Sequence, residues 1–280
     1  MGNRFMNKKW ILGLLLAASL TGCGSDGGGS SNSSAAVSAA DSNTATRGAV
    51  STAAAAVPLG TAANYAILAT KGAATVPASV VTGNVGLSPA AKSYLTGWSQ
   101  TDDVTDTYAT SAQVLSPGRL YSASNIGGST SADLTTAVAN METAYTNAAG
   151  RTATNADTTN TNGGAIGGLT LKPGVYEFGS AVGITGSDLT LNGTATDVWI
   201  IKMTGALTMA AGKNVTLAGG ALPQNVFWQV AGAVTIDANA HFEGIILAKE
   251  AITFGNKASI KGRLFSQAAV NLDATTVTVP

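Results

Sequence analysis

The sequence predicts a β-solenoid, in which short strands stack into coils, with one α-helix packed along a face of the stack. Three observations support this fold. The phrases AVTI, AITF and AVNL recur at residues 233, 251 and 269, in two steps of 18 residues, and repetition at a fixed period is typical of a solenoid. Gly accounts for 34 of 280 residues while only 11% are charged, which favours tight turns and closely spaced strands. One segment near residue 140 has helical spacing instead.

The strand-like phrases fall into groups of three, one group for each coil. From the C-terminus backwards they are RLFS, AVNL, TTVTV; IILA, AITF, ASIKG; VFWQV, AVTI, AHFEG; and, more loosely, VWIIK, ALTM, NVTL and VYEF, AVGI, LTLNG. We expect the residues at the joints to supply positive φ angles: Gly193, Gly212, Gly232, Gly255, Asn256 and Gly262. A β-sandwich is the alternative, but it predicts antiparallel hairpins rather than a likeness between every third strand.

The second phrase of each group contains two kinds of residue, because side chains alternate between the two faces of a strand. The large apolar residues are expected to point into the coil: Val182 and Ile184, Leu207 and Met209, Val234 and Ile236, Ile252 and Phe254, Val270 and Leu272. The residues expected to point outward are small and uncharged: Ala181 and Gly183, Ala206 and Thr208, Ala233 and Thr235, Ala251 and Thr253, Ala269 and Asn271.

The first phrase of each group is apolar at both parities, as in a strand that is buried on both sides. The predicted helix, residues 132–149, can cover this first face. Leu134, Val138, Met141 and Tyr145 lie on one side of it, with Ser131 as the expected N-cap and Gly150 at the C′ position. Trp199 and Trp228 are interpreted as core residues under this helix, not as platforms for sugars.

The face formed by the second phrases then stays uncovered. Stacked strands lie about 4.8 Å apart and alternate residues along a strand about 6.7 Å apart, so the outward Ala, Thr and Asn side chains are expected to form a flat grid. A rigid, uncharged array of methyl and hydroxyl groups can hold surface water in an ordered, ice-like layer.

Several long phrases also match a known family in the right order: YAILATKG (65–72), TGNVGLSP (82–89), GGLTLKPGVYEFG (167–179), DVWIIK (197–202), NVFWQV (225–230) and AHFEGIILAK (240–249). From about Leu59 to Pro280 the sequence resembles microbial ice-binding proteins of the DUF3494 type. The resemblance implies a discontinuous right-handed β-solenoid of triangular section with a long helix alongside, whose N-terminal segment adds strands to the same stack. It also implies ice binding through one flat wall, with thermal hysteresis and inhibition of ice recrystallisation.

On this basis the expected ice-binding residues are Thr208, Thr235, Thr253, Asn271, Ala206, Ala233, Ala251, Ala269 and Gly183, with Thr75 added from the phrase AATV. Some relatives carry a T-A/G-x-T/N motif on this wall. Here the motif occurs at 61–64 and 152–155, outside the expected strands of the second face.

The N-terminus resembles a bacterial lipoprotein signal. Arg4, Lys8 and Lys9 precede an apolar run, and the only cysteine, Cys23, follows Leu20-Thr21-Gly22. We expect a signal peptide at 1–22, a low-complexity tether at 23–56 and the ice-binding domain at 57–280, with Cys23 as the lipidated residue. The protein is then expected to be exported and lipid-anchored at the outer membrane or cell surface, or released to the medium. An ordinary signal peptide with an incidental cysteine is the alternative.

Other function classes fit the sequence less well. The chain has 15 basic and 15 acidic residues, so its net charge of zero does not favour nucleic acid as a partner. Polysaccharide lyases also use β-solenoids, but Asp237, Asp273, Glu243, Lys261 and His241 are spread over different strands. We therefore expect a monomer without enzymatic activity, catalytic residues, cofactor or metal. A surface adhesin or spacer without ice affinity is the main alternative.

Overall fold

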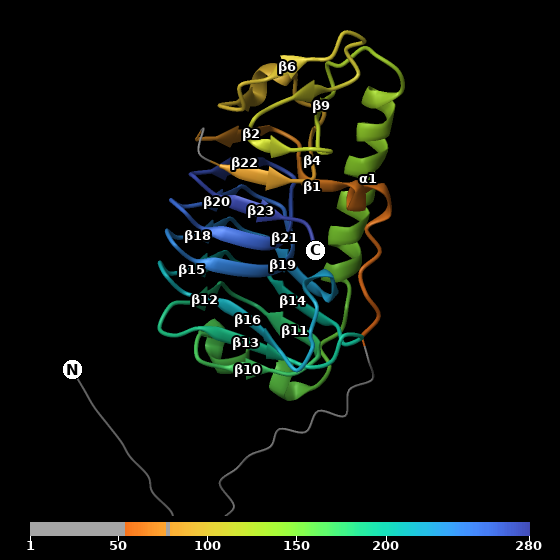
Figure 1. The fold of residues 1–280 in the computed structure, drawn as a ribbon. Coiled ribbons are helices and arrows are strands. Elements are labelled where there is room, and N and C mark those ends of the chain that lie inside the picture. Colours follow the sequence, from red (N-terminus) through yellow and green to blue (C-terminus); the bar gives the residue numbers. More distant parts are fainter. Residues whose placement is uncertain (1–53, 77–78) are drawn as a thin grey trace, which may run out of the picture. The chain divides into compact units, whose positions relative to one another are not determined.

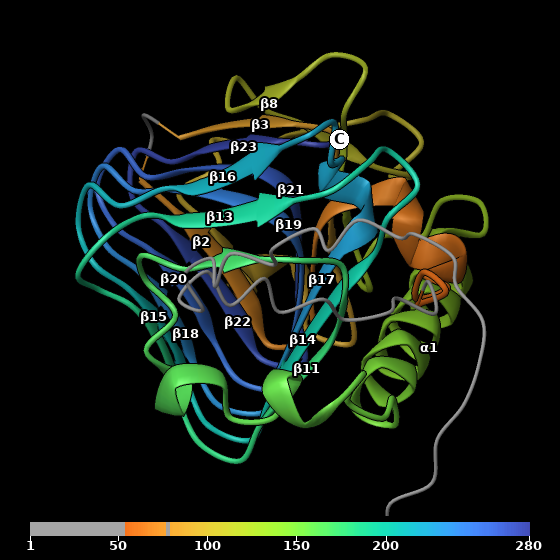
Figure 2. The same cartoon turned by 90° about the horizontal axis from the view of Figure 1, so that it is seen from below.

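Figure 1 shows the fold in a computed structural model that describes residues 54–76 and 79–280. These residues belong to the compact unit Arg47–Pro280. Nearly all strands pair in parallel and stack into three faces around an apolar interior, which Figure 2 shows end-on. Three-strand coils with parallel pairing confirm the predicted β-solenoid.

The strands of each face follow one another up the stack. The first face contains β11 (Gly174–Phe178), β14 (Trp199–Met203), β17 (Val226–Val230), β19 (His241–Ala248), β21 (Ser259–Ser266), β1 (Tyr65–Ala69), β4 (Asn84–Leu87) and β9 (Leu120–Ser122). The second face contains β12 (Val182–Ile184), β15 (Leu207–Met209), β18 (Val234–Ile236), β20 (Ile252–Phe254), β22 (Ala269–Leu272), β2 (Gly72–Thr75) and β5 (Leu95–Thr96). The third face contains β10 (Thr170–Leu171), β13 (Leu189–Asn192), β16 (Val215–Ala218), the starts of β19 and β21, β23 (Thr276–Thr278), β3 (Val80–Thr82) and β8 (Val114–Leu115).

The solenoid is discontinuous in sequence. The C-terminal coil does not end the stack, because β21, β22 and β23 pair with the N-terminal strands β1, β2 and β3. These in turn pair with β4, β5 and β8. The chain therefore builds one end of the stack first and reaches the other end through α1 before it builds the remaining coils, as the family resemblance implied.

The helix α1 (Thr130–Ala149) begins two residues before the predicted start. Its 20 residues extend about 30 Å, enough to pass about six stacked strands, and Figure 1 shows it running along the stack. Leu134, Ala137, Met141, Ala144 and Ala148 are buried in a cluster with apolar residues of the first face. Val138 and Tyr145, which were predicted to face the sheet, lie at the margin of this cluster and are half-buried. The helix therefore covers the first face, as expected.

Both ends of α1 differ in detail from the prediction. The N-cap is Ser129, not Ser131, and its hydroxyl donates to Asp133 Oδ2 at 2.6 Å instead of capping the backbone. Gly150 is the C-cap and has right-handed helical geometry, with φ −78°. At this end the Lys202 ammonium donates to the Ala149 carbonyl at 3.2 Å, which satisfies a terminal carbonyl and complements the helix dipole.

The corners after the second face have a common geometry. Gly212, Asn239 and Lys257, at equivalent places in successive coils, all have positive φ angles between 59° and 68°. Of the expected positions only Gly212 is among them. The other expected positions do not have positive φ angles: Gly193, Gly232, Gly255, Asn256 and Gly262. At the four glycines among them, glycine is required because a side chain would have no room. A Cβ on Gly262, for example, would lie 1.7 Å from the carbonyl oxygen of Gly244 in the neighbouring coil.

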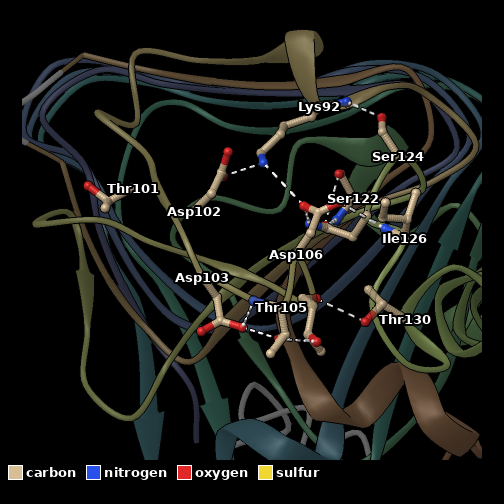
Figure 3. A network of polar contacts seen from close by, with 12 residues as sticks. Lys92, Thr101, Asp102, Asp103, Thr105, Asp106, Ser122, Ser124, Ile126 and Thr130 are labelled. Carbon is tan, nitrogen blue, oxygen red and sulfur yellow. Dashed lines mark hydrogen bonds and ion pairs between the residues drawn. The ribbon is translucent and has the colours of Figure 1, made fainter.

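The remaining short elements lie at the ends of the stack or, like η1 (Gly60–Asn64) beside α1 and η5 (Pro223–Asn225) beside β19, along its side. One end carries β6 (Thr101–Asp102) and β7 (Ala109–Thr110), which are antiparallel to each other, and the other 3-10 helices are η2 (Lys92–Tyr94), η3 (Ala156–Thr158) and η4 (Thr161–Gly164). Figure 3 shows how the loop after β6 is held. Asp106 accepts from the Ile126 amide at 3.0 Å and from Asn125 Nδ2 at 2.9 Å, and Lys92 pairs with Asp102. The network links η2, β6 and the segment after β9, so it caps this end of the solenoid.

Within residues 54–76 and 79–280, no helix is both long enough and apolar enough to cross a lipid bilayer. Cys23 and the predicted signal peptide and tether up to residue 53 lie outside the described residues.

Candidate functional site

The second face carries one continuous file of small outward side chains. Strand register places Gly183, Thr208, Thr235, Thr253 and Asn271 directly beside one another. The three threonines are exposed, whereas the residues on either side of each in the same strand are buried. The predicted division into inward and outward residues is therefore confirmed for these strands.

The file continues into the N-terminal coils, but not through Thr75. Thr75 is paired with the inward Leu272 and is only 8% exposed, so the expectation that it projects from the face is wrong. The residue beside Asn271 is Ala74, and the residue beside Ala74 is the exposed Thr96. Both parities of the phrase AATV are small, so side-chain size could not reveal which of them points inward. The short phrase YLTG, which contains Thr96, carried no signal beyond Leu95.

A second file precedes the first along each strand. Its members are half-buried alanines: Ala206, Ala233, Ala251 and Ala269. Backbone hydrogen bonds and strand register place them at equivalent positions of neighbouring coils. Gly72 pairs with Ala269 and extends this file. The two files together form a surface of methyl groups and hydroxyls, at a strand spacing of about 4.8 Å and a file spacing of about 6.7 Å.

The surface is rigid because of what lies beneath it. The inward residues of these strands are fully buried in the solenoid interior, for example Leu207, Ile252 and Phe254 at 0–1% exposed. No register shift interrupts the pairing from β12 to β22. Threonine adds local stiffness, since its β-branch restricts rotation about χ1. The hydroxyls are therefore held at positions set by the backbone.

Charged residues border this surface and do not enter the two files. Asp237 and Asp273 follow β18 and β22 at the edge, where Asn256 Nδ2 donates to Asp273 Oδ1 at 3.1 Å. Lys249 and Glu250 lie at the opposite edge, before β20. The centre of the face, around Thr235 and Thr253, is neutral.

The third face is different in chemistry. His241 Nδ1 lies 2.8 Å from Ser259 Oγ, and its Nε2 lies 3.1 Å from Glu243 Oε1. Nearby, hydrogen bonds from Asn214 lower the pKa of Asp188 below its usual value of 3.8. Among the described residues no group of three His, Cys, Asp or Glu side chains could hold a metal ion. Of the residues considered for lyase chemistry, His241, Glu243 and Lys261 are neighbours on the third face, whereas Asp237 and Asp273 lie at the edge of the second face.

Trp199 and Trp228 are buried, but not under the helix. Both point into the solenoid interior, where their indole N–H groups donate to the carbonyls of Leu171 at 3.3 Å and Glu243 at 3.0 Å. The neighbouring Ile200 and Phe227 meet α1 instead. Both tryptophans are therefore core residues with satisfied hydrogen bonds.

Comparison with known proteins gives this architecture a family. A model of the family described as Ice-binding-like matches residues 67–278, most of the region that the structure describes. The chain belongs to the Ice-binding-like family. The match covers all three faces of the solenoid as well as α1, so the sequence resemblance is confirmed.

Relatives of this Ice-binding-like chain occur in fungi and bacteria. It is 54% identical over 196 residues to ice-binding protein K1-A of Typhula ishikariensis, covering 70% of this chain and 78% of the relative. It is 44% identical over 228 residues to an ice-binding protein of Flavobacterium frigoris, covering 80% and 76%. Among solved structures, the glycosylated ice-binding protein LeIBP from an Arctic yeast aligns with a TM-score of 0.77 at 43% identity, covering 80% of this chain and 94% of that one.

Proposed function

We propose that this protein binds ice crystals through the second face of its solenoid. The observation that carries the proposal is the uninterrupted file of small, neutral outward residues across β12, β15, β18, β20, β22, β2 and β5. The first face is covered by α1 and the third carries charged side chains, so the second is the face on which a regular water layer meets no charge. The names of the relatives support the same function.

The proposed mechanism follows from the rigidity of the surface. Hydroxyls on Thr208, Thr235 and Thr253 hydrogen-bond water at fixed positions, while the alanine methyls restrict the neighbouring water sterically. Because folding has already ordered these groups, the water layer adopts the spacing of the grid. Ice growth then incorporates that layer, and the protein stays at the crystal surface.

Adsorption at the surface blocks further growth around each bound molecule. The protein is therefore proposed to produce thermal hysteresis and to inhibit ice recrystallisation. No catalysis, cofactor or metal takes part. The residues proposed to contact ice are Thr208, Thr235, Thr253, Asn271, Ala206, Ala233, Ala251, Ala269 and Gly183, with Ala74 and Thr96 replacing Thr75.

The protein is further proposed to act outside the cell. The signal-like N-terminus and Cys23 support export with a lipid anchor at the outer membrane or cell surface. Such an anchor is the proposed contact with a membrane, and the folded domain would work as a monomer at the end of the tether.

Partition into ice tests the function directly. When a solution of the full chain is slowly frozen onto a cold probe, an ice-binding protein is enriched in the ice, whereas an adhesin or spacer stays in the liquid. We expect enrichment together with crystals that stay small during annealing. Exclusion from the ice would contradict the proposal and favour the adhesin or spacer.

The substitution of one threonine by serine tests the role of the methyl groups. Thr253→Ser keeps the hydroxyl on the second face and removes the methyl, so thermal hysteresis should fall measurably without being lost. Ser at the exposed Thr216 of the third face is the matched control and should leave it unchanged. An unchanged value for Thr253→Ser would mean that the methyl does not order water.

A further inference from the structure

A polar cavity of about 570 Å³ lies beside the helix, away from the second face. It is open to solvent on one side and is lined by η1, the first half of α1 and the first-face strands β1, β4 and β9. The side chains that matter for its chemistry are Asn64, Tyr65, Asn84, Tyr121 and Asp133. Its size falls within the range of pockets that bind small organic molecules.

Tyr65 forms one wall of this cavity, and its position is fixed by packing. Its side chain is only 8% exposed, and its ring lies over Gly86, where a Cβ would come within 2.8 Å of two ring carbons. The Tyr121 ring packs edge-on against it, with centroids 6.1 Å apart and planes at 83°. Glycine at position 86 and the second ring together fix the orientation of Tyr65.

The two tyrosine hydroxyls at this wall are not used within the described part of the protein. Neither the Tyr65 hydroxyl nor the Tyr121 hydroxyl has a hydrogen-bond partner among the described residues, and the Tyr65 hydroxyl is not sealed from the cavity. By contrast, Asn84 Nδ2 donates to the Asn64 carbonyl at 3.0 Å. The Tyr65 hydroxyl is open to the cavity, so water bonds to it in the free protein and a polar ligand atom can replace that water.

The electrostatics of the cavity favour a neutral ligand. Asp133 is the one charged side chain of the lining, and it lies in the first turn of α1, where the helix dipole offsets its charge. The carboxylate opposes an anion, while the dipole and the lack of a second acid oppose a cation. Burial, with smaller contributions from Tyr121 and Asp133, raises the pKa of Tyr65 to about 12, so its hydroxyl remains a donor at neutral pH.

We propose that this cavity binds a neutral saccharide unit. Two tyrosine hydroxyls that can donate or accept, one carboxylate that accepts and one amide match the mixed donors and acceptors of a sugar ring. The carbon atoms of the two tyrosine rings add apolar contact area for a sugar ring. Because the cavity and the second face lie on different sides of the solenoid, sugar and ice could be held at the same time.

Nuclear magnetic resonance can test this binding with defined probes. The ¹⁵N-labelled full chain is titrated separately with glucose, galactose and N-acetylglucosamine, with galacturonate and glycerol as comparison compounds. At least one neutral sugar should shift the amide signals of η1 and of the first turns of α1, with a Kd on the order of 1 mM. No shift with any of the three sugars, or stronger binding of galacturonate or glycerol, would overturn the proposal.

Matched variants locate the site. Tyr65→Phe keeps the ring and removes the unpartnered hydroxyl, so it should weaken sugar binding about tenfold, the effect of one lost hydrogen bond. Tyr145→Phe, a tyrosine on the second half of α1 outside the cavity, should bind as the unchanged chain does. Asp133→Asn provides a second variant in case Tyr65→Phe does not fold.

The outcome is independent of the ice proposal. Both cavity variants should partition into ice normally, since neither touches the second face. Sugar binding that survives both Tyr65→Phe and Asp133→Asn would show that the cavity is not the site.

Discussion

The packing of α1 on the first face can be tested by truncating one buried side chain. Met141 is 1% exposed and lies in the apolar cluster between helix and sheet. Met141→Ala removes three heavy atoms, worth about 2.4 kcal/mol at about 0.8 kcal/mol for each buried group, and the cavity left behind adds to this. We expect a loss of about 3 kcal/mol in unfolding free energy. For a domain of this size that corresponds to a melting temperature lower by about 6–12 °C.

Calorimetric melting of the full chain measures this loss. Glu142→Ala, at the adjacent exposed position of the same helix, is the matched control and should change the melting temperature by less than about 2 °C. Ice partition of Met141→Ala near 0 °C should be retained, because the second face does not contact α1. A shift for Met141→Ala no larger than for Glu142→Ala would refute the packing argument.

Three further perturbations have defined outcomes. Lys202→Met removes the contacts of the ammonium group with the Ala149 carbonyl at 3.2 Å and with Glu177 Oε2 at 3.1 Å. The free energy of unfolding, measured by denaturant titration, should fall by about 1–2 kcal/mol. No loss would mean that the C-terminal carbonyls of α1 are satisfied without Lys202. Burial raises the pKa of Tyr176 from 10.0 to about 12. The protonated Tyr176 side chain therefore contributes to folding stability fully below pH 10, and this contribution is lost as the pH rises toward 12. Tyr176→Phe should therefore lose less melting temperature than the unchanged chain between these pH values, and equal losses would contradict this assignment. Cys23→Ala should move the protein from the membrane fraction to the soluble fraction, and unchanged fractionation would exclude the lipid anchor.

Much of the fold could be read from the sequence because its signals are repetitive. Along the strands of the second face large and small residues alternate. This pattern determines that Thr208, Thr235 and Thr253 all point outward. The 18-residue step then places Thr235 beside Thr253, as the register shows. The helix was equally visible, since Leu134 and Met141 recur at helical spacing among polar neighbours.

The structure departs from the predictions where side-chain size does not distinguish the two faces of a strand. Ala73, Ala74 and Thr75 are all small, so the register of β2 is set by pairing with β22 and not by its own pattern. The corners show the same limit: the positive φ of Lys257 is imposed by the neighbouring coils, although lysine is not a residue that favours it. The cavity beside α1 brings together residues from 61 to 136, and no local phrase indicates it.

The most direct test of ice binding by the second face compares one substitution on two faces. Thr235→Tyr places a bulky side chain in the centre of the exposed file, and Thr216→Tyr places the same side chain at an exposed position of the third face. Both side chains point outward, so both melting temperatures should stay within about 2 °C of the unchanged chain. We predict that Thr235→Tyr loses most thermal hysteresis and most enrichment in ice, and that Thr216→Tyr retains both. Loss of ice affinity in Thr216→Tyr with full activity in Thr235→Tyr would show that ice binds to a different face.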